Sequence, residues 1–257
     1  MTSTTVRLDT DGPVATITLA NPQKRNALSL ETLHELTDAI HAVPDDARVV
    51  VLAAEGPVFS AGHDLGEMID RPAAFYDRLF ADCTTMMESL HRIPQPVIAK
   101  VQGPATAAGC QLVASCDLAV AAEEAWFATP GVRIGLFCTT PMVPIVRSIG
   151  RKRAMQMLLT GEPVDAHTAA EWGLVNTVVP VDELDKAVDE LVATILRWSA
   201  ETIAIGKRAF YAQVDLPEPA AYEVAQPIMA QNAAIPDAQE GMSAFLEKRP
   251  PMWKGLS

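Results

Sequence analysis

The sequence has few cysteines, few aromatic residues and no long apolar run. Its four cysteines form no CxxC pair and lie among apolar or small residues, so we expect reduced thiols and no metal site. No apolar stretch approaches the length of a membrane span. The opening residues, MTSTTVRLDTDG, lack the basic and apolar segments of a secretory signal. These absences predict a cytoplasmic protein with no membrane partner.

Basic residues are also scarce, with 20 Lys and Arg against 32 Asp and Glu and a formal net charge of −12. This balance argues against general nucleic-acid binding, which needs a basic surface. A local basic patch can still bind an anionic ligand. With 257 residues, 49% of them hydrophobic, the chain can form one domain with a sizeable core, or one domain with an appended subdomain.

The chain alternates strands and helices and then becomes entirely helical. Apolar, β-branched runs predict strands over residues 5–8, 14–19, 48–54, 97–101 and 174–179. The run RVVVLAA at 48–54 is continuously apolar, as in a strand covered on both faces. Helices are predicted over 182–198, 201–213, 219–234 and 237–249, the last with a capping box of Asp237 and Glu240. The composition predicts an α/β region over residues 1–180 and a helical region over 181–257.

The stretch from residue 97 to 120 leads from a strand through very small residues into a helix and back to a strand. After the turn at Gly103 and Pro104 come ATAAG and a helix predicted over 110–116. Small residues at this place allow a ligand to approach the free N–H groups of the first helical turn, which can bind an anion or an oxyanion. Tight packing of the junction on its own core is an equally good explanation.

A second junction of the same kind lies in EGPVFSAGHDLGEM, residues 55–68. Here a strand ends near Ser60, a small turn follows, and Asp64 is positioned to cap a short helix. Two such junctions can supply two backbone N–H groups to one oxygen, which stabilises an enolate or a tetrahedral oxyanion. We interpret His63 chiefly as a backbone donor with a locally packed ring, and a catalytic base as the alternative. Cys138 has no base close to it in the sequence, which argues against a nucleophile.

With these residues described, the chain resembles the enoyl-CoA hydratase/isomerase (crotonase) family over nearly its whole length. The resemblance rests on five segments in the right order: NPQKRNALS, FSAGHDLGEM, GPATAAGCQLVASCDLAVA, LTGEPVDAHTAAEWGLVNTVVP and EGMSAFLEKRPPMW. It implies an α/β fold, a crotonase-like spiral of ββα units with a C-terminal helical oligomerisation region. It also implies assembly into trimers or dimers of trimers.

The resemblance implies an acyl-CoA substrate whose thioester oxygen is held by the backbone N–H groups of His63 and Ala108. Coenzyme A is then part of the substrate, and no separate cofactor is implied. The residues implied to border the acyl and adenine parts are Ala61, Asp64, Leu65 and Gly66, and those implied to contact phosphate are Lys24, Arg25 and Lys248. A solvated loop is the commoner role of two such cations, and Lys248 can equally be an exposed cation at a helix end.

Two departures from the family pattern concern its catalytic glutamates. Gln111 and Gly131 occupy the positions of the two glutamates that activate water in the hydratases, and Thr139 stands where some members have an aspartate. An amide can orient water but cannot act as a carboxylate base. Since a positioned proton-transfer group contributes ~10²–10⁴ in rate, hydration should be severely weakened. Hydration gained on substituting Gln111→Glu together with Gly131→Glu would show that the pocket and the oxyanion-binding groups are intact. The other titratable groups near these motifs, which the sequence does not rank, are His63, Glu67, Asp70, Glu123 and Glu124.

The sequence therefore predicts an acyl-CoA-binding enzyme, a lyase or isomerase of fatty-acid-type thioesters, that stabilises a thioester enolate. Hydration of 2-enoyl-CoA is the family's usual reaction, and the residues at positions 111 and 131 argue against it. The alternatives are isomerisation, decarboxylation or thioester hydrolysis, or a non-catalytic acyl-CoA-binding protein.

Overall fold

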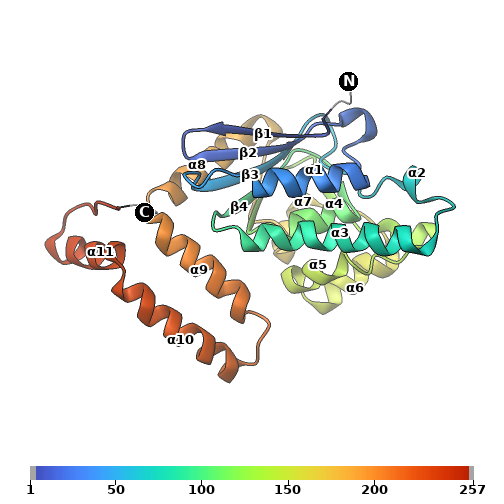
Figure 1. Cartoon of the computed structure of the whole chain (residues 1–257). Coiled ribbons are helices and arrows are strands. Elements are labelled where there is room, and N and C mark those ends of the chain that lie inside the picture. The colour runs from blue at the N-terminus through green and yellow to red at the C-terminus, as the bar shows by residue number, and fades with distance from the viewer. Residues whose placement is uncertain (1–3, 255–257) are drawn as a thin grey trace.

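The computed structural model describes residues 4–254, which form two β-sheets flanked by helices (Figure 1). The larger sheet has the strand order β1-β2-β3-β4-β6-β9. Its first pair is antiparallel and all its other pairs are parallel. The strands are β1 (Val6–Asp11), β2 (Val14–Leu19), β3 (Val49–Ala54), β4 (Val97–Val101), β6 (Leu118–Ala122) and β9 (Thr177–Val179). The predicted strands are thus confirmed, with ends that shift by up to three residues.

Strand β3 is buried on both faces, as its continuous apolar sequence predicts. Val49 and Val51 pack with Leu184 and Val188 of helix α8 (Leu184–Leu196). Val50 and the other alternate residues join the larger core on the opposite face. Because successive side chains of a strand point to opposite faces, a two-sided core requires an apolar residue at every position. Helix α8 lies within the region predicted to be only helical, yet it packs on the sheet.

Helices cover the larger core, and two of them begin at side chains that cap the first turn. Ser29 accepts a hydrogen bond from the Thr32 N–H at 3.1 Å, and Asp165 accepts one from the Thr168 N–H at 2.9 Å. Each cap satisfies one of the free donors of a first helical turn. The helices are α1 (Leu30–His41), α2 (Leu65–Met68), α3 (Ala73–Arg92), α4 (Ala108–Ala114), α5 (Met142–Ile149), α6 (Arg151–Thr160) and α7 (Ala166–Trp172).

A second, three-stranded sheet, absent from the sequence-based prediction, holds the region around helix α4. Its order is β5-β7-β8, with β5 (Ala105–Thr106), β7 (Trp126–Ala128) and β8 (Val164–Asp165). Strands this short carry almost no periodic signal, so their sequence reads as loop. Helix α4 begins at Ala108, two residues before its predicted start. With this earlier start, the Ala108 N–H is one of the free donors in the first turn of the helix.

Three helices, α9 (Ala200–Gln213), α10 (Glu218–Ala234) and α11 (Pro236–Glu247), form an arm that extends away from the sheets (Figure 1). No residue of α9 or α10 is buried as a whole, although the side chain of Lys207 on α9 is only 6% exposed. The arm is attached through Lys207, whose ammonium lies 2.7 Å from the Asp117 carboxylate and donates to the carbonyl oxygens of Leu90 and Gln95. Tyr211 donates to the other Asp117 oxygen at 2.8 Å.

The predicted capping box at the start of α11 is wrong. Asp237 lies inside the helix and accepts a hydrogen bond from the Ser199 hydroxyl at 2.6 Å, while Glu240 pairs with Arg249. These carboxylates tie α11 to α9 and to the following segment instead of capping the helix. The division into regions 1–180 and 181–257 stays a prediction, and residues 1–3 and 255–257 of those regions lie outside the described part of the chain.

Candidate active site

The two predicted junctions meet in the structure. Ser60 forms a parallel bridge with Ala105, and its carbonyl oxygen accepts the Thr106 N–H at 2.9 Å. Gly62 has a φ of +85°, and a Cβ placed on it would lie 2.8 Å from the Ala107 Cβ and 3.2 Å from the Ala108 nitrogen. Only glycine combines that backbone conformation with so close an approach. The small residues of both segments therefore serve to bring His63 and Ala108 into one neighbourhood.

Gly109 on α4 packs against the same turn, at Ser60. A Cβ on Gly109 would lie 2.4 Å from the Ser60 carbonyl oxygen, closer than van der Waals contact allows. The Ser60 hydroxyl is itself used to hold the loop, because it donates to the Asn26 carbonyl oxygen at 2.8 Å. The first turn of α4 is thus packed directly against the turn that contains His63.

The backbone N–H groups of His63 and Ala108 donate no hydrogen bond to another group among residues 4–254. The Ala61 N–H, by contrast, donates to the Arg25 carbonyl oxygen, and the Ala107 N–H donates to the Ala128 carbonyl oxygen at 2.9 Å. Unpaired N–H groups are rare in a protein interior. Two of them, one at a helix N-terminus, can bind one oxygen atom that carries negative charge.

Ala107, the residue before the second donor, is conformationally strained. Its φ of 50° and ψ of −118° lie in a region that side-chain-bearing residues rarely adopt. Such a conformation costs on the order of 1–3 kcal/mol, and it persists only where the surroundings enforce it. The strain turns the chain sharply into α4, so that the Ala108 N–H faces the Gly62 turn.

The ring of His63 is packed locally, as the sequence predicts. Its Nδ1 lies 3.2 Å from the Leu28 carbonyl oxygen, and its edge meets the Phe80 ring at 5.5 Å between centroids. Burial lowers the pKa of His63, against smaller opposing effects of the Leu28 carbonyl and the Glu67 charge. Its Nε2 is buried and has no hydrogen-bond partner.

Two more buried polar atoms without partners lie near α4. The Gln111 Oε1 is on the first turns of the helix, and the Thr129 Oγ1 follows the residue that accepts the Ala107 N–H. Buried polar atoms are nearly always hydrogen-bonded, so these two atoms are available to bind a water molecule or a substrate group. Thr129 was not predicted, because an isolated threonine between a strand and a proline carries no signal of its own.

Gly131 is closed to any side chain, which limits the double substitution considered from the sequence. A Cβ on Gly131 would lie 1.9 Å from the Leu136 carbonyl oxygen and 2.8 Å from the Cys138 sulfur. The Gly131→Glu substitution therefore cannot place a carboxylate here without moving the backbone. Burial raises the pKa of the Cys138 thiol, which keeps it protonated and unreactive. Thr139 follows it and is exposed.

The residues predicted to contact coenzyme A are only partly brought together. Lys24 pairs with Asp64 at 3.2 Å, and Asp64 caps α2 by accepting the Gly66 N–H at 3.0 Å. The Arg25 carbonyl accepts the Ala61 N–H, and Leu65 is exposed beside them. Lys248 follows α11, which lies at the opposite end of the molecule from α2 (Figure 1). Its contact with phosphate stays a prediction.

The unranked acidic residues have contacts of their own or lie in solvent. Glu67 accepts the Leu30 N–H at 2.9 Å, and Glu123 lies 3.8 Å from His167 on α7. Asp70 and Glu124 are exposed. The junction of His63 and Ala108 thus receives no carboxylate from the positions where the hydratases have glutamates.

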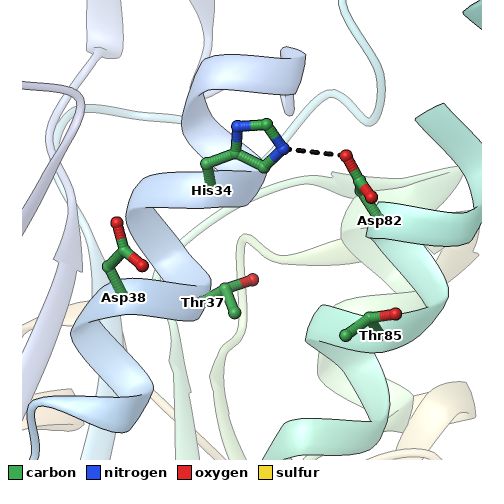
Figure 2. A pocket seen from close by; sticks show the side chains of 5 residues that line it. All are labelled: His34, Thr37, Asp38, Asp82 and Thr85. Atoms are coloured by element: carbon green, nitrogen blue, oxygen red, sulfur yellow. Dashed lines mark hydrogen bonds and ion pairs between the residues drawn. The ribbon is translucent and has the colours of Figure 1, made fainter. Parts of the chain in front are cut away.

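Two cavities lie away from this junction. One, of about 360 Å³, lies between α1 and α3, where His34 and Asp82 pair at 2.8 Å beside Asp38 and two threonines (Figure 2). The other, of about 440 Å³, lies between α3 and α9. It is lined by Glu88, His91, Arg92, Arg208 and Tyr211. Neither includes a predicted site residue.

No group of three or more His, Cys, Asp or Glu side chains within residues 4–254 is arranged to hold a metal ion. None of the helices described in that range is long and apolar enough to cross a membrane.

Comparison with known proteins identifies the family of this chain. The family model described as "Enoyl-CoA hydratase/isomerase" matches residues 9–256. The chain belongs to the enoyl-CoA hydratase/isomerase family. Among its relatives is the mouse (Mus musculus) "Enoyl-CoA hydratase domain-containing protein 3, mitochondrial", 45% identical over 93% of this chain and 81% of the mouse protein. A "Probable enoyl-CoA hydratase" of Rhodobacter capsulatus is 34% identical over 98% of both chains.

Solved structures agree with the family assignment. The crystal structure of an enoyl-CoA hydratase from Mycobacterium smegmatis superposes with a TM-score of 0.95, at 48% identity, over 97% of this chain and 98% of that one. The predicted α/β, crotonase-like fold with C-terminal helices is thus confirmed. Membership of the enoyl-CoA hydratase/isomerase family sets the class of chemistry and leaves the reaction itself to be argued from the site.

Proposed function

We propose that this enoyl-CoA hydratase/isomerase family member binds acyl-CoA thioesters and stabilises a thioester enolate with the N–H groups of His63 and Ala108. The observation that supports this most is the contact of Gly62 with Ala107 and Ala108, beside which both N–H groups have no acceptor among the described residues. Donors fixed in advance toward developing charge lower the barrier without reorganising, and one such donor is worth ~10²–10³ in rate where it has been removed.

Hydration by a pair of carboxylates is the reaction that the site supports least. Gln111 supplies an amide, and the Gly131 position is occupied by the Leu136 backbone. The Gln111 Oε1 can orient a water molecule or a substrate hydroxyl, but an amide cannot take up the proton. Isomerisation, decarboxylation and thioester hydrolysis each pass through charge on the thioester oxygen and remain the enzymatic alternatives. A non-catalytic acyl-CoA binder is the alternative outside enzymes.

The coenzyme A phosphates would be bound near Lys24 and Arg25, two adjacent cations of which Lys24 pairs with Asp64. Lys248 could reach that group only from a second copy of the chain. The arm helices support assembly into a homotrimer or a dimer of trimers, because they leave large apolar side chains exposed, which monomeric proteins seldom do. These side chains are Phe210, Tyr222, Met229, Phe245 and Leu246. A cytoplasmic location remains our expectation, although several relatives are named mitochondrial.

Calorimetric titration with crotonyl-CoA, together with steady-state hydration of the same ester, tests this proposal. We expect the natural chain to bind the ester and to turn it over with a kcat below the usual enzyme range of ~1–10³ per second. The Gln111→Glu variant, which needs no backbone movement, should bind equally well. Turnover by the natural chain at ordinary hydratase rates would contradict our reading of positions 111 and 131. Absence of binding would contradict the proposal itself, and binding without turnover of any thioester would favour the non-catalytic alternative.

A further inference from the structure

The cavity of about 440 Å³ between α3 and α9 lies where the arm meets the rest of the molecule (Figure 1). Its volume falls in the range of small-molecule sites, about 300–1,000 Å³. Its lining comes from the end of α3 and from α9 and consists of Glu88, His91, Arg92, Arg208 and Tyr211. Two of these residues are arginines and one is a carboxylate, in a chain whose formal net charge is −12. The cavity is therefore a local basic site, of the kind that attracts an anion.

The two arginines come from different parts of the molecule and differ in their partners. Arg92, the last residue of α3, pairs with Glu88, and both side chains are exposed. Arg208 on α9 is exposed and makes no ion pair or hydrogen bond through its side chain within residues 4–254. A guanidinium group presents a planar fork of N–H donors that fits the oxygens of phosphate and carboxylate. An anion in the cavity can thus be bound from the arm and from the body at once.

The His91 ring contributes one nitrogen to the protein and leaves the other for the cavity. Its Nε2 lies 2.9 Å from the Ser115 carbonyl oxygen, which can only accept, so Nε2 carries a proton. Its Nδ1 has no partner among the described residues and, unlike the His63 Nε2, is not buried. Because His91 lines the cavity, Nδ1 is the ring nitrogen that a ligand there can reach. The neutral ring accepts a hydrogen bond at Nδ1, and the protonated ring donates one.

Buried contacts behind the cavity hold its walls in place. Tyr211 stacks on His91 with 3.9 Å between ring centroids and donates to Asp117 at 2.8 Å. Lys207 on α9 binds the same carboxylate and donates to the Leu90 carbonyl oxygen near the end of α3. That carbonyl is one of those that a helix C-terminus leaves free, so its pairing removes a negative partial charge from beside the cavity. Walls that are already ordered reduce the entropy cost of binding a ligand.

We propose that this cavity binds a small organic phosphate monoester, with phosphoryl oxygens held by Arg92 and Arg208 and a hydrogen bond to the His91 Nδ1. Phosphate fits better than carboxylate because its second pKa, about 6, lets it donate a proton to the neutral ring near neutral pH. A phosphoryl group alone is much smaller than the cavity, so the organic part of the ligand fills the remainder. A ligand held from both α3 and α9 fastens the arm to the body. This inference is independent of the thioester site.

Binding should take up a proton, because the phosphate and the His91 Nδ1 share one. The charged and titratable groups around this ring, from α3, α9 and the residue before β6, are Glu88, Arg92, Lys207, Arg208, Tyr211 and Asp117. Among the effects on the pKa of His91, burial is the largest and lowers it, so the ring is neutral in the free protein at pH 8.0. An anion beside the ring favours its charged form. Affinity should therefore increase as the pH falls from 8.0 to 6.5.

Calorimetric titration of the whole chain with phenyl phosphate, at pH 7.0 and low ionic strength, tests the inference. Arg208→Gln should weaken binding at least ~10-fold, because it removes charge-assisted hydrogen bonds. Glu88→Gln should bind more tightly than the natural chain, because it removes the carboxylate that lines the cavity and frees Arg92. Since this second variant predicts a gain, a folding defect cannot produce the expected pattern. Arg151→Gln, at an exposed arginine that begins α6, is the matched control and should bind like the natural chain.

The same titrations at pH 8.0 and 6.5 test the role of His91. His91→Phe keeps a ring on Tyr211 and should lose the increase in affinity at the lower pH. The inference is overturned if phenyl phosphate does not bind, if Arg208→Gln binds within three-fold of the natural chain, or if Arg151→Gln weakens binding equally. It is also overturned if Lys24→Gln abolishes binding instead, which would assign the phosphate to the proposed coenzyme A site. Benzoate that binds as tightly as phenyl phosphate would overturn the assignment to phosphate.

Discussion

The carbonyl oxygen of Leu136 lies where a side chain on Gly131 would have to begin, 1.9 Å from an ideally placed Cβ. The absence of a glutamate at this position is therefore built into the backbone, because the segment after the 3₁₀ turn of residues 130–134 folds over the Gly131 α-carbon. Placing a carboxylate at position 131 would require rebuilding this loop, so packing as well as composition argues against hydration by a glutamate pair at positions 111 and 131.

Gly131→Ala should destabilise the protein. A methyl group forced against a backbone oxygen requires the chain to shift, and overpacking of this kind typically costs about 1–3 kcal/mol. Gly206→Ala is the matched control, because a Cβ there meets nothing within 4 Å and the residue lies inside α9. That control should gain about 0.5–1 kcal/mol from helix propensity. Urea unfolding of both variants measures the change in the free energy of unfolding, which should be negative for Gly131→Ala and positive for Gly206→Ala. No change in Gly131→Ala would refute the packing argument.

Ala107→Gly should stabilise the fold. The positive φ of Ala107 costs on the order of 1–3 kcal/mol, whereas the added freedom of glycine in the unfolded chain costs only about 0.5–1 kcal/mol. We expect a net gain near 1 kcal/mol in the free energy of unfolding. The Ala108 N–H is untouched, so thioester binding should persist. A loss of stability would show that the Ala107 methyl group contributes packing that outweighs the strain.

Lys207→Met should loosen the attachment of the arm. It removes a buried ammonium from a carboxylate that is 17% exposed, and breaking a fully buried pair typically costs about 3–5 kcal/mol. Since Tyr211 and the Val97 N–H still bind Asp117, we expect a value near the lower end. Lys186→Met, which removes an exposed lysine 3.9 Å from Glu190, should change little. Equal effects of the two substitutions in thermal unfolding would contradict the buried role of Lys207.

Stability should fall on mild acidification. His63 and His91 both have a pKa lowered from the ordinary 6.5, in each case chiefly by burial. As the pH drops below about 6.5, the unfolded chain therefore takes up more protons than the folded chain. The free energy of unfolding is highest above that pH and decreases as the pH falls toward the lower pKa values of the folded state. Unfolding by urea at pH 7.0 and at pH 5.5 should show a smaller loss in the double variant His63→Phe/His91→Phe than in the natural chain. An equal loss would assign the effect to other groups.

Much of the fold follows from local sequence. The apolar run of β3 predicts a two-faced strand, and Ser29 and Asp165 mark helix starts correctly, because these signals depend on neighbours within one or two turns. Asp237 misled for the same reason: its spacing to Glu240 fits a capping box, but Ser199 and Arg249, distant in sequence, take both carboxylates. The strands β5, β7 and β8 are too short to show a period.

The site was predictable where it depends on backbone room and not where it depends on distant atoms. The small residues around Gly62 and Gly109 indicated a close approach of two segments, and the structure confirms it. That Leu136 fills the Gly131 position, that Thr129 is left unpaired, and that α11 lies at the opposite end of the molecule from α2 all depend on chain paths that the sequence does not encode locally.

The carbonyl stretch of a bound thioester tests the central claim most directly. Infrared difference spectra of butyryl-CoA labelled with ¹³C at the carbonyl would be recorded free, bound to the natural chain and bound to His63→Pro, with circular dichroism to verify that the variant is folded. Two N–H donors polarise the carbonyl, so the account predicts a stretch at lower frequency in the natural complex and a substantially smaller shift in His63→Pro. A bound thioester whose carbonyl frequency equals that of the free ester would contradict the oxyanion site of His63 and Ala108.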